Sequence, residues 1–177
     1  MKKGLVLFVL LLCQIANAQD RIIGCQVILD YDYGEYIDVF YQDSNNYFPF
    51  AKVKNDLDRE VIMVMDLTGK TDEFFRVNIK SGLFYDTFEL SDVYVHKEHL
   101  VILSRLLEHP MPLFSEPSKN SSVVMTIPNS YGYVYKVLDC DGNWLKVEYT
   151  DEDKKCHIGW MAPEYQCSNP YSACMGM

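Results

Sequence analysis

The chain has 177 residues, with 16 basic and 25 acidic side chains and a formal charge of −9. Hydrophobic residues make up 49% of it, and 13 tyrosines and 9 phenylalanines give the composition of a folded protein and exclude a disordered one. The acidic excess opposes nucleic acid and anionic membrane surfaces as partners, because both carry negative charge.

The first 18 residues have the composition of a secretory signal peptide. Two lysines precede an apolar run over residues 5–12, and residues 16–18 read Ala-Asn-Ala, a small-residue cleavage pattern. The run is shorter than the roughly 20 residues of a membrane span. We therefore expect residues 1–18 to be removed and the mature protein to be exported, periplasmic or secreted, without membrane insertion. Removal leaves 14 basic and 25 acidic residues, a formal charge of −11.

Short β-favouring runs, separated by turn-rich or charged stretches, follow in the next part of the chain. They are residues 39–41, 61–65, 74–79 and 93–95. Residues 99–109 contain a longer apolar stretch that fits either a strand or one short helix. Proline and charge interrupt the apolar pattern at residues 108–110, where we place a domain boundary.

The second half of the chain repeats this plan. Its β-favouring runs are residues 112–114, 123–125, 133–138, 144–149 and 156–161, with an Asp-Gly hairpin signal at residues 141–142. Small domains of many short strands are usually compact barrels or sandwiches. The predicted fold class is therefore all-β.

One arrangement occurs in both halves: an apolar run, an Asp-x-x-Gly turn, and a strand that begins with an aromatic residue. The turns are residues 66–69 and 139–142, and the aromatic residues are Phe74 and Trp144. Because strand side chains alternate between faces, both aromatics are predicted to lie on the polar outer face, beside charged strand-mates. We interpret these rings as parts of a binding surface.

Three segments carry motifs of a known family: Pro-Leu-Phe-Ser-Glu-Pro-Ser at residues 112–118, Asp-Gly-Asn-Trp-Leu-Lys-Val at residues 141–147, and Gly-Trp-Met-Ala-Pro-Glu-Tyr at residues 159–165. Together they resemble bacterial SH3 domains over residues 110–166. Residues 36–100 are similar in outline, with residues 94–99 corresponding to 160–165. The resemblance implies two small SH3-like barrels in tandem after the signal peptide. The expected domains are a diverged copy at residues 19–108, a second copy at 109–166 and a cysteine-containing tail at 167–177.

What the resemblance implies about function is a non-enzymatic module that binds a peptide in a shallow aromatic groove. The ligand would be a peptidoglycan stem peptide or a segment of an envelope protein. Its expected ligand-binding residues are Phe114, Trp144, Trp160, Tyr165 and, in the first half, Phe74, although Trp160 could instead fill the barrel. The alternative is a structural or assembly protein whose outward aromatics are buried between modules or subunits.

The mature chain keeps an odd number of cysteines, so at least one is unpaired or bonded to another chain. They are Cys25, Cys140, Cys156, Cys167 and Cys174. Cys167 and Cys174 bracket a short loop of turn-forming residues, and we expect a disulfide between them. Cys140 and Cys156 flank opposite ends of a predicted strand, too far apart to bond at about 3.3 Å per residue. The pairing of Cys25, Cys140 and Cys156 stays open.

No catalytic or metal-binding pattern stands out. His96 and His99 would point to opposite faces of a strand, and an enzyme built from them and a cysteine is only a competing hypothesis. Cys156, His157 and Cys167 match no paired-ligand zinc spacing. We therefore expect no enzymatic activity, no metal and no cofactor.

Overall fold

The computed structural model of the protein describes residues 24–30, 32–34, 36–54, 63–81, 88–105, 110–128, 133–169 and 174. Over these residues the chain forms 13 β-strands, two 3₁₀-helices and no α-helix, so the predicted all-β fold class is confirmed. Within the described part of the chain, no helix is long and apolar enough to cross a bilayer. The predicted signal peptide lies outside the described residues, as does most of the predicted domain boundary.

The strands of the first half are β1 (Gln26–Leu29), β2 (Tyr36–Asp43), β3 (Asn46–Lys54), β4 (Met63–Lys70), β5 (Phe74–Ser81), β6 (Phe88–His96) and β7 (Leu100–Ser104). Those of the second half are β8 (Met111–Phe114), β9 (Val123–Ile127), β10 (Val134–Asp141), β11 (Trp144–Thr150), β12 (Cys156–Met161) and β13 (Gln166–Cys167). In the segment with two sequence interpretations, residues 99–109, the described part contains the strand β7 over Leu100–Ser104.

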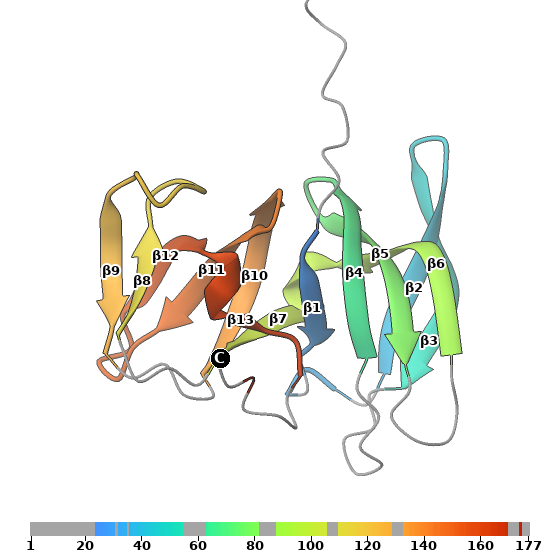
Figure 1. Ribbon diagram of the computed structural model, residues 1–177. Coiled ribbons are helices and arrows are strands. Elements are labelled where there is room, and N and C mark those ends of the chain that lie inside the picture. The colour runs from blue at the N-terminus through green and yellow to red at the C-terminus, as the bar shows by residue number, and fades with distance from the viewer. Residues whose placement is uncertain are drawn as a thin grey trace, which may run out of the picture.

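All strands belong to one sheet in the order β3-β2-β6-β5-β4-β1-β7-β10-β11-β12-β8-β9, with β13 paired to β7. Figure 1 shows β8 to β12 on the left, β1 to β6 on the right, and β7 running between the two groups. The chain is thus organised as two groups of strands joined through one central strand.

Each half follows the same succession of elements. A hairpin, β2–β3 or β8–β9, is followed by a three-stranded meander, β4–β5–β6 or β10–β11–β12. A single 3₁₀ turn then follows, η2 (Lys97–His99) or η3 (Pro163–Tyr165), and leads into a last strand, β7 or β13. In both halves the first hairpin strand pairs with the last strand of the meander.

The register of strand pairing in the two meanders is also alike. A bulge interrupts β4–β5 at Thr68, six positions before Phe74, and β10–β11 at Leu138, six positions before Trp144. In the pairing of meander strands, Tyr94 lies opposite Arg76 in the same way that Trp160 lies opposite Lys146. In this register, the strand residues of the segment 94–99 stand opposite β5 as the strand residues of the segment 160–165 stand opposite β11.

Strand β7 serves both halves. It pairs with β1 at the end of the first half and with β10 and β13 in the second. The backbone N–H of Asp30 donates to the carbonyl of His99 at 2.8 Å, and the N–H of Arg105 donates to the carbonyl of Tyr165 at 2.9 Å. The residue after β1 thus bonds to the end of η2, and the residue after β7 bonds in the same way to the end of η3. In the second half, β7 therefore has the position that β1 has in the first half. Every residue of β7 is buried.

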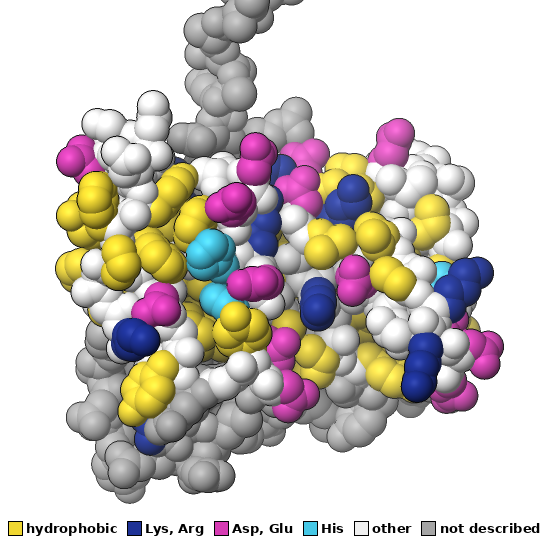
Figure 2. All heavy atoms as spheres, turned by 180° about the vertical axis from the view of Figure 1, so that it is seen from behind, with side chains coloured by type: hydrophobic (Ala, Val, Ile, Leu, Met, Phe, Trp, Pro, Cys, Tyr) yellow, Lys and Arg dark blue, Asp and Glu magenta, His cyan; other side chains and the backbone are white. Residues whose placement is uncertain are grey.

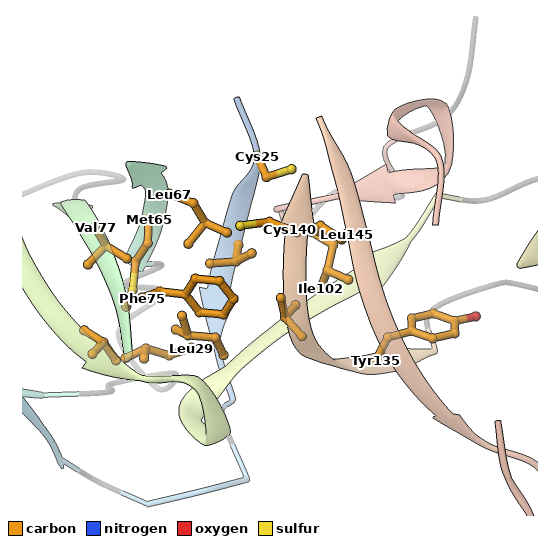
Figure 3. Packing of buried hydrophobic residues seen from close by; sticks show 14 of the residues in the cluster. Cys25, Leu29, Met65, Leu67, Phe75, Val77, Ile102, Tyr135, Cys140 and Leu145 are labelled. Atoms are coloured by element: carbon orange, nitrogen blue, oxygen red, sulfur yellow. The ribbon is translucent and has the colours of Figure 1, made fainter. Parts of the chain in front are cut away.

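The hydrophobic core is continuous through both halves. The inward side chains of β5 and β11 join one cluster with those of β1, β7 and β10, and Figure 3 shows part of this packing. Large fully buried members include Phe75, Ile102, Tyr135 and Leu145. Two groups of strands therefore share one interior, which is where most of the stabilising apolar burial lies.

The disulfide expected between Cys167 and Cys174 is present, with the Cα atoms 5.8 Å apart. Cys156 and Cys140 lie at opposite ends of β11, facing Thr150 and Leu145, as their separation in the sequence predicted. The tail is thereby tied to β13, and β13 is held against β7.

Candidate functional site

Three aromatic residues from three strands lie on the outer face of the second half, and the rings of two of them, Phe114 and Trp144, are in contact. Phe114 at the end of β8 lies opposite Trp160 of β12, and its ring meets that of Trp144 edge-on with centroids 5.5 Å apart. Phe114 is 7% exposed, whereas both tryptophans are half-buried and keep part of their rings open to solvent. The structure thus brings together three of the five residues predicted from the sequence.

Strand alternation places Trp144 on this face. Along β11 the burial pattern alternates, with Leu145, Val147 and Tyr149 buried. Trp144 therefore shares the partly exposed face with Lys146 and Glu148. The Asp-Gly turn before it is a hairpin turn, in which Gly142 has a φ of 57° that suits glycine.

The loop between β8 and β9 directly follows Phe114 and reaches η3. Its ends are joined by the bond from the Ser115 N–H to the Ser122 carbonyl at 2.8 Å, and Lys119 Nζ lies 2.6 Å from Glu164 Oε1 on η3. Tyr165, on the same 3₁₀ turn, is half-buried and packs against the hydrophobic core. Its position on η3 therefore gives Tyr165 a role in core packing.

In the first half, the residue that corresponds to Trp144 is Phe74, and other aromatic rings cover it. Phe74 lies on the outer face of β5, as predicted, but it is only 5% exposed. The ring of Tyr47 stacks on it at 4.3 Å, and the rings of His96 and Phe40 lie at 4.1 and 5.4 Å. The expectation that Phe74 displays its ring to solvent is therefore wrong, because the β2–β3 hairpin of its own half covers it.

Exposed aromatic side chains of the first half lie further out on that hairpin. Tyr41 and Phe48 stack at 5.3 Å and are 44% and 41% exposed, and Phe50 is 57% exposed. Figure 2, which views the molecule from behind, shows hydrophobic side chains gathered on its left side, next to histidine side chains. These residues belong to none of the sequence motifs described above, and the signal for them in the sequence is the high density of aromatics in residues 36–50.

His96 and His99 lie close together, with ring centroids 5.8 Å apart. His99 is 6% exposed, and its burial lowers the pKa of its imidazole. Its ring also contacts that of Tyr33, at a centroid distance of 3.9 Å. This pair is part of the aromatic packing of the first half.

The free thiols are poor nucleophiles in this environment. Burial raises the pKa of Cys25 and of Cys140 to about 12, and the pKa of Cys156 is raised as well. Over the part of the chain that the structure describes, no three His, Cys, Asp or Glu residues are placed to hold a metal ion. What the outer face of the second half offers a ligand is therefore a set of partly buried aromatic rings.

A polar cavity of about 320 Å³ lies where β1, β7 and η3 meet. Its lining includes Asp66, Arg105, Asn143 and Gln166. Gln26 donates to Asp66 Oδ1 at 2.8 Å, and Gln166 donates to the carbonyl of Asn143 at 2.9 Å. Each of these bonds lies within one half, whereas the Ser168 hydroxyl donates to Gln26 Oε1 at 3.1 Å and so links the two halves at the cavity wall.

Comparison with known families matches residues 111–165 to the bacterial SH3 domain. The matched range begins at β8 and ends at Tyr165, so it contains Phe114, Trp144 and Trp160. No curated protein and no solved structure matches the chain. The match indicates a binding module in the second half.

Proposed function

We propose that the protein is an exported, non-enzymatic binding module that holds a peptide against Phe114, Trp144 and Trp160. The observation that carries this proposal is the half-buried Trp144, placed among charged strand-mates and edge-on to Phe114. A ring that large in such a position leaves apolar area for a ligand to cover. The bacterial SH3 match over the same residues supports a binding role.

The geometry suits a shallow site. Tryptophan supplies a large contact area with few rotamers to lose, and such residues dominate the energy of many interfaces. Lys146 and Glu148 flank the rings on the same face and offer polar contacts to a peptide backbone or a charged terminus. The proposed ligand is a peptidoglycan stem peptide or a segment of an envelope protein, and the acidic chain favours amine-bearing ligands over anionic ones.

We also propose that the first half is a diverged SH3-like barrel, so that the chain is a tandem with a shared strand. The matching bulges, the matching 3₁₀ turns and the repeated pairing of meander and hairpin support it. Because Tyr47 covers Phe74, this half acts as a scaffold at that position, and ligand binding falls to the second half.

A structural or assembly role is the second candidate function. The observation that favours it is the exposed aromatic group of Tyr41, Phe48 and Phe50 on the β2–β3 hairpin, away from the covered Phe74. In this reading a neighbouring subunit covers these three rings. Alanine replacement of Tyr41 and Phe48 would then reduce the mass seen in sedimentation.

A matched pair of variants, Trp144→Ala and Phe74→Ala, tests the binding proposal. Stem tetrapeptide affinity is measured by calorimetry, and unfolding is followed by heat. For Trp144→Ala we expect at least about a tenfold loss of affinity, the effect of removing an interface anchor, with little change in melting. For Phe74→Ala we expect unchanged affinity and a stability loss of about 3–5 kcal/mol, typical of a buried ring.

The reverse pattern contradicts the proposal. If Trp144→Ala unfolds as readily as Phe74→Ala and binds as well as the unchanged protein, Trp144 is a structural residue. Phe74→Ala serves as the control for general loss of folding, because it occupies the same position in the other half.

A further inference from the structure

Two buried free cysteines from opposite halves of the chain share one core. Cys25, just before β1, is 2% exposed, and Cys140, near the end of β10, is 1% exposed. They belong to the same hydrophobic cluster although 115 positions separate them in the sequence. Figure 3 shows their labelled side chains extending into the space between β1 and β10.

Hydrogen bonds to the backbone hold Cys25 close to the end of β10 on one side and to β4 on the other. The N–H of Gly24 donates to the carbonyl of Gly142 at 3.2 Å, and the Cys25 thiol donates to the same carbonyl at 3.5 Å. Gly142 is in the turn that directly follows Cys140, so the start of β1 is held against the end of β10. The Leu67 N–H donates to the Cys25 carbonyl at 2.9 Å, which holds Cys25 from the side of β4.

Cys140 is held in turn by the first half. Lys70 Nζ donates to its carbonyl at 2.8 Å and lies 2.6 Å from Asp139 Oδ1. Burial raises the pKa of Cys25, and repulsion between its thiolate and that of Cys140 adds to this effect. Backbone bonds thus hold the start of β1 and the end of β10 together, and both thiols are buried in the same core. A disulfide needs its two Cα atoms within about 7 Å, and this facing arrangement is the geometry from which the proposal starts.

We propose that Cys25 and Cys140 are joined by a second disulfide when the protein folds with a disulfide-bonded oxidant, such as a thiol oxidoreductase or glutathione disulfide. One cysteine thiolate attacks the S–S bond of the oxidant and forms a mixed disulfide. The second thiolate then displaces the oxidant's remaining sulfur. Two S–H bonds are lost and one S–S bond forms. The oxidant takes the two electrons and two protons and leaves as a dithiol in the case of the oxidoreductase, or as two glutathione thiols in the case of glutathione disulfide.

The proposal rests on the proposed export only for where the oxidant is met, since such bonds persist in oxidising compartments. The bond would link β1 to β10, on opposite sides of β7, and so would tie the two halves covalently. It also assigns the remaining cysteines, because Cys167 and Cys174 are bonded and Cys156 is exposed. Cys156 is then the single free thiol of the mature chain.

The order of events follows from burial. A thiol with a pKa of about 12 has roughly a thousandfold less thiolate at neutral pH than one with a pKa of 9, so the folded, reduced protein exchanges slowly. The bond therefore forms before the core closes. Oxidation of the folded protein should modify Cys156 and leave the buried pair reduced until denaturant is added.

The test is a thiol count on the mature protein, residues 19–177, refolded in a buffer of reduced and oxidised glutathione and then denatured without reductant. We expect one thiol per chain, at Cys156, and a Cys25–Cys140 peptide in the digest. We also expect a urea midpoint that is higher for the oxidised than for the reduced protein. A Cys25→Ala, Cys140→Ala variant is the control, because it keeps Cys167–Cys174 and should show a smaller shift of the midpoint on reduction.

Three thiols per chain, or a digest in which Cys156 is bonded to Cys25 or Cys140, overturns the proposal. The count on the unchanged sequence decides the matter even where the double variant does not fold. Peptide binding by Trp144 is measured separately, so a failure of this bond leaves the proposed function standing, and the reverse also holds.

Discussion

Replacement of Ile102 by alanine should weaken both halves of the protein together. Ile102 is fully buried in β7, opposite Tyr135, and belongs to the continuous core. The change removes three carbon atoms, worth about 0.8 kcal/mol each in transfer free energy, and leaves a cavity as well. We expect a loss of about 3–4 kcal/mol in the free energy of unfolding, within the range seen for buried Ile→Ala changes.

Urea unfolding with one probe in each half measures this effect. Both tryptophans, Trp144 and Trp160, lie in the second half, so their fluorescence follows the unfolding of that half. The NMR signals of His96 and His99 follow the unfolding of the first half. With a denaturant slope of about 2 kcal/mol/M, both midpoints should fall by roughly 1.5–2 M and remain coincident. A tryptophan transition that does not move, or two transitions that separate, would refute the shared role of β7.

Two further changes probe single contacts. Gly159→Ala should lower the free energy of unfolding by about 1–3 kcal/mol, because an added Cβ would lie 2.8 Å from the side chains of Leu113 and Val124. Thermal or urea unfolding measures this change. Unchanged stability would contradict the tight packing of β12 against the β8–β9 hairpin. Burial lowers the pKa of His99 below that of the unfolded chain, so the unfolded chain takes up its proton first as the pH falls. Stability should therefore be complete above about pH 6.5 and decline below it, and melting between pH 8 and pH 5 should show a flatter profile for His99→Gln; an identical slope would contradict this role.

Local pattern was sufficient to place the tryptophan of the proposed site. The period of two in residues 144–149 predicts which side chains face inward, and Leu145 and Val147 are indeed fully buried. The Asp-Gly pair predicts the hairpin before Trp144, and Gly142 has the positive φ that such turns require. These features depend on neighbours in the sequence, which is why a single sequence reveals them.

Contacts between distant segments could not be predicted in the same way. Nothing in the sequence near Phe74 indicates that Tyr47 stacks on it, since the contact depends on how the β2–β3 hairpin folds over β5. All five residues of strand β7 are buried, and four of them, residues 100–103, form an uninterrupted apolar run. Such a run does not distinguish a strand from a helix by its period. Its double pairing, with β1 and with β10, is a property of the whole sheet.

The most direct test of the proposed function is an NMR titration of the mature protein with peptidoglycan stem tetrapeptide, in which the indole N–H signals of Trp144 and Trp160 are followed. The proposal predicts a saturable shift of the Trp144 signal, while the backbone signals of Tyr41 and Phe48 on the far hairpin stay in place. A Trp144 signal that does not respond, with shifts confined to that hairpin, would contradict it and would move the binding surface to the first half.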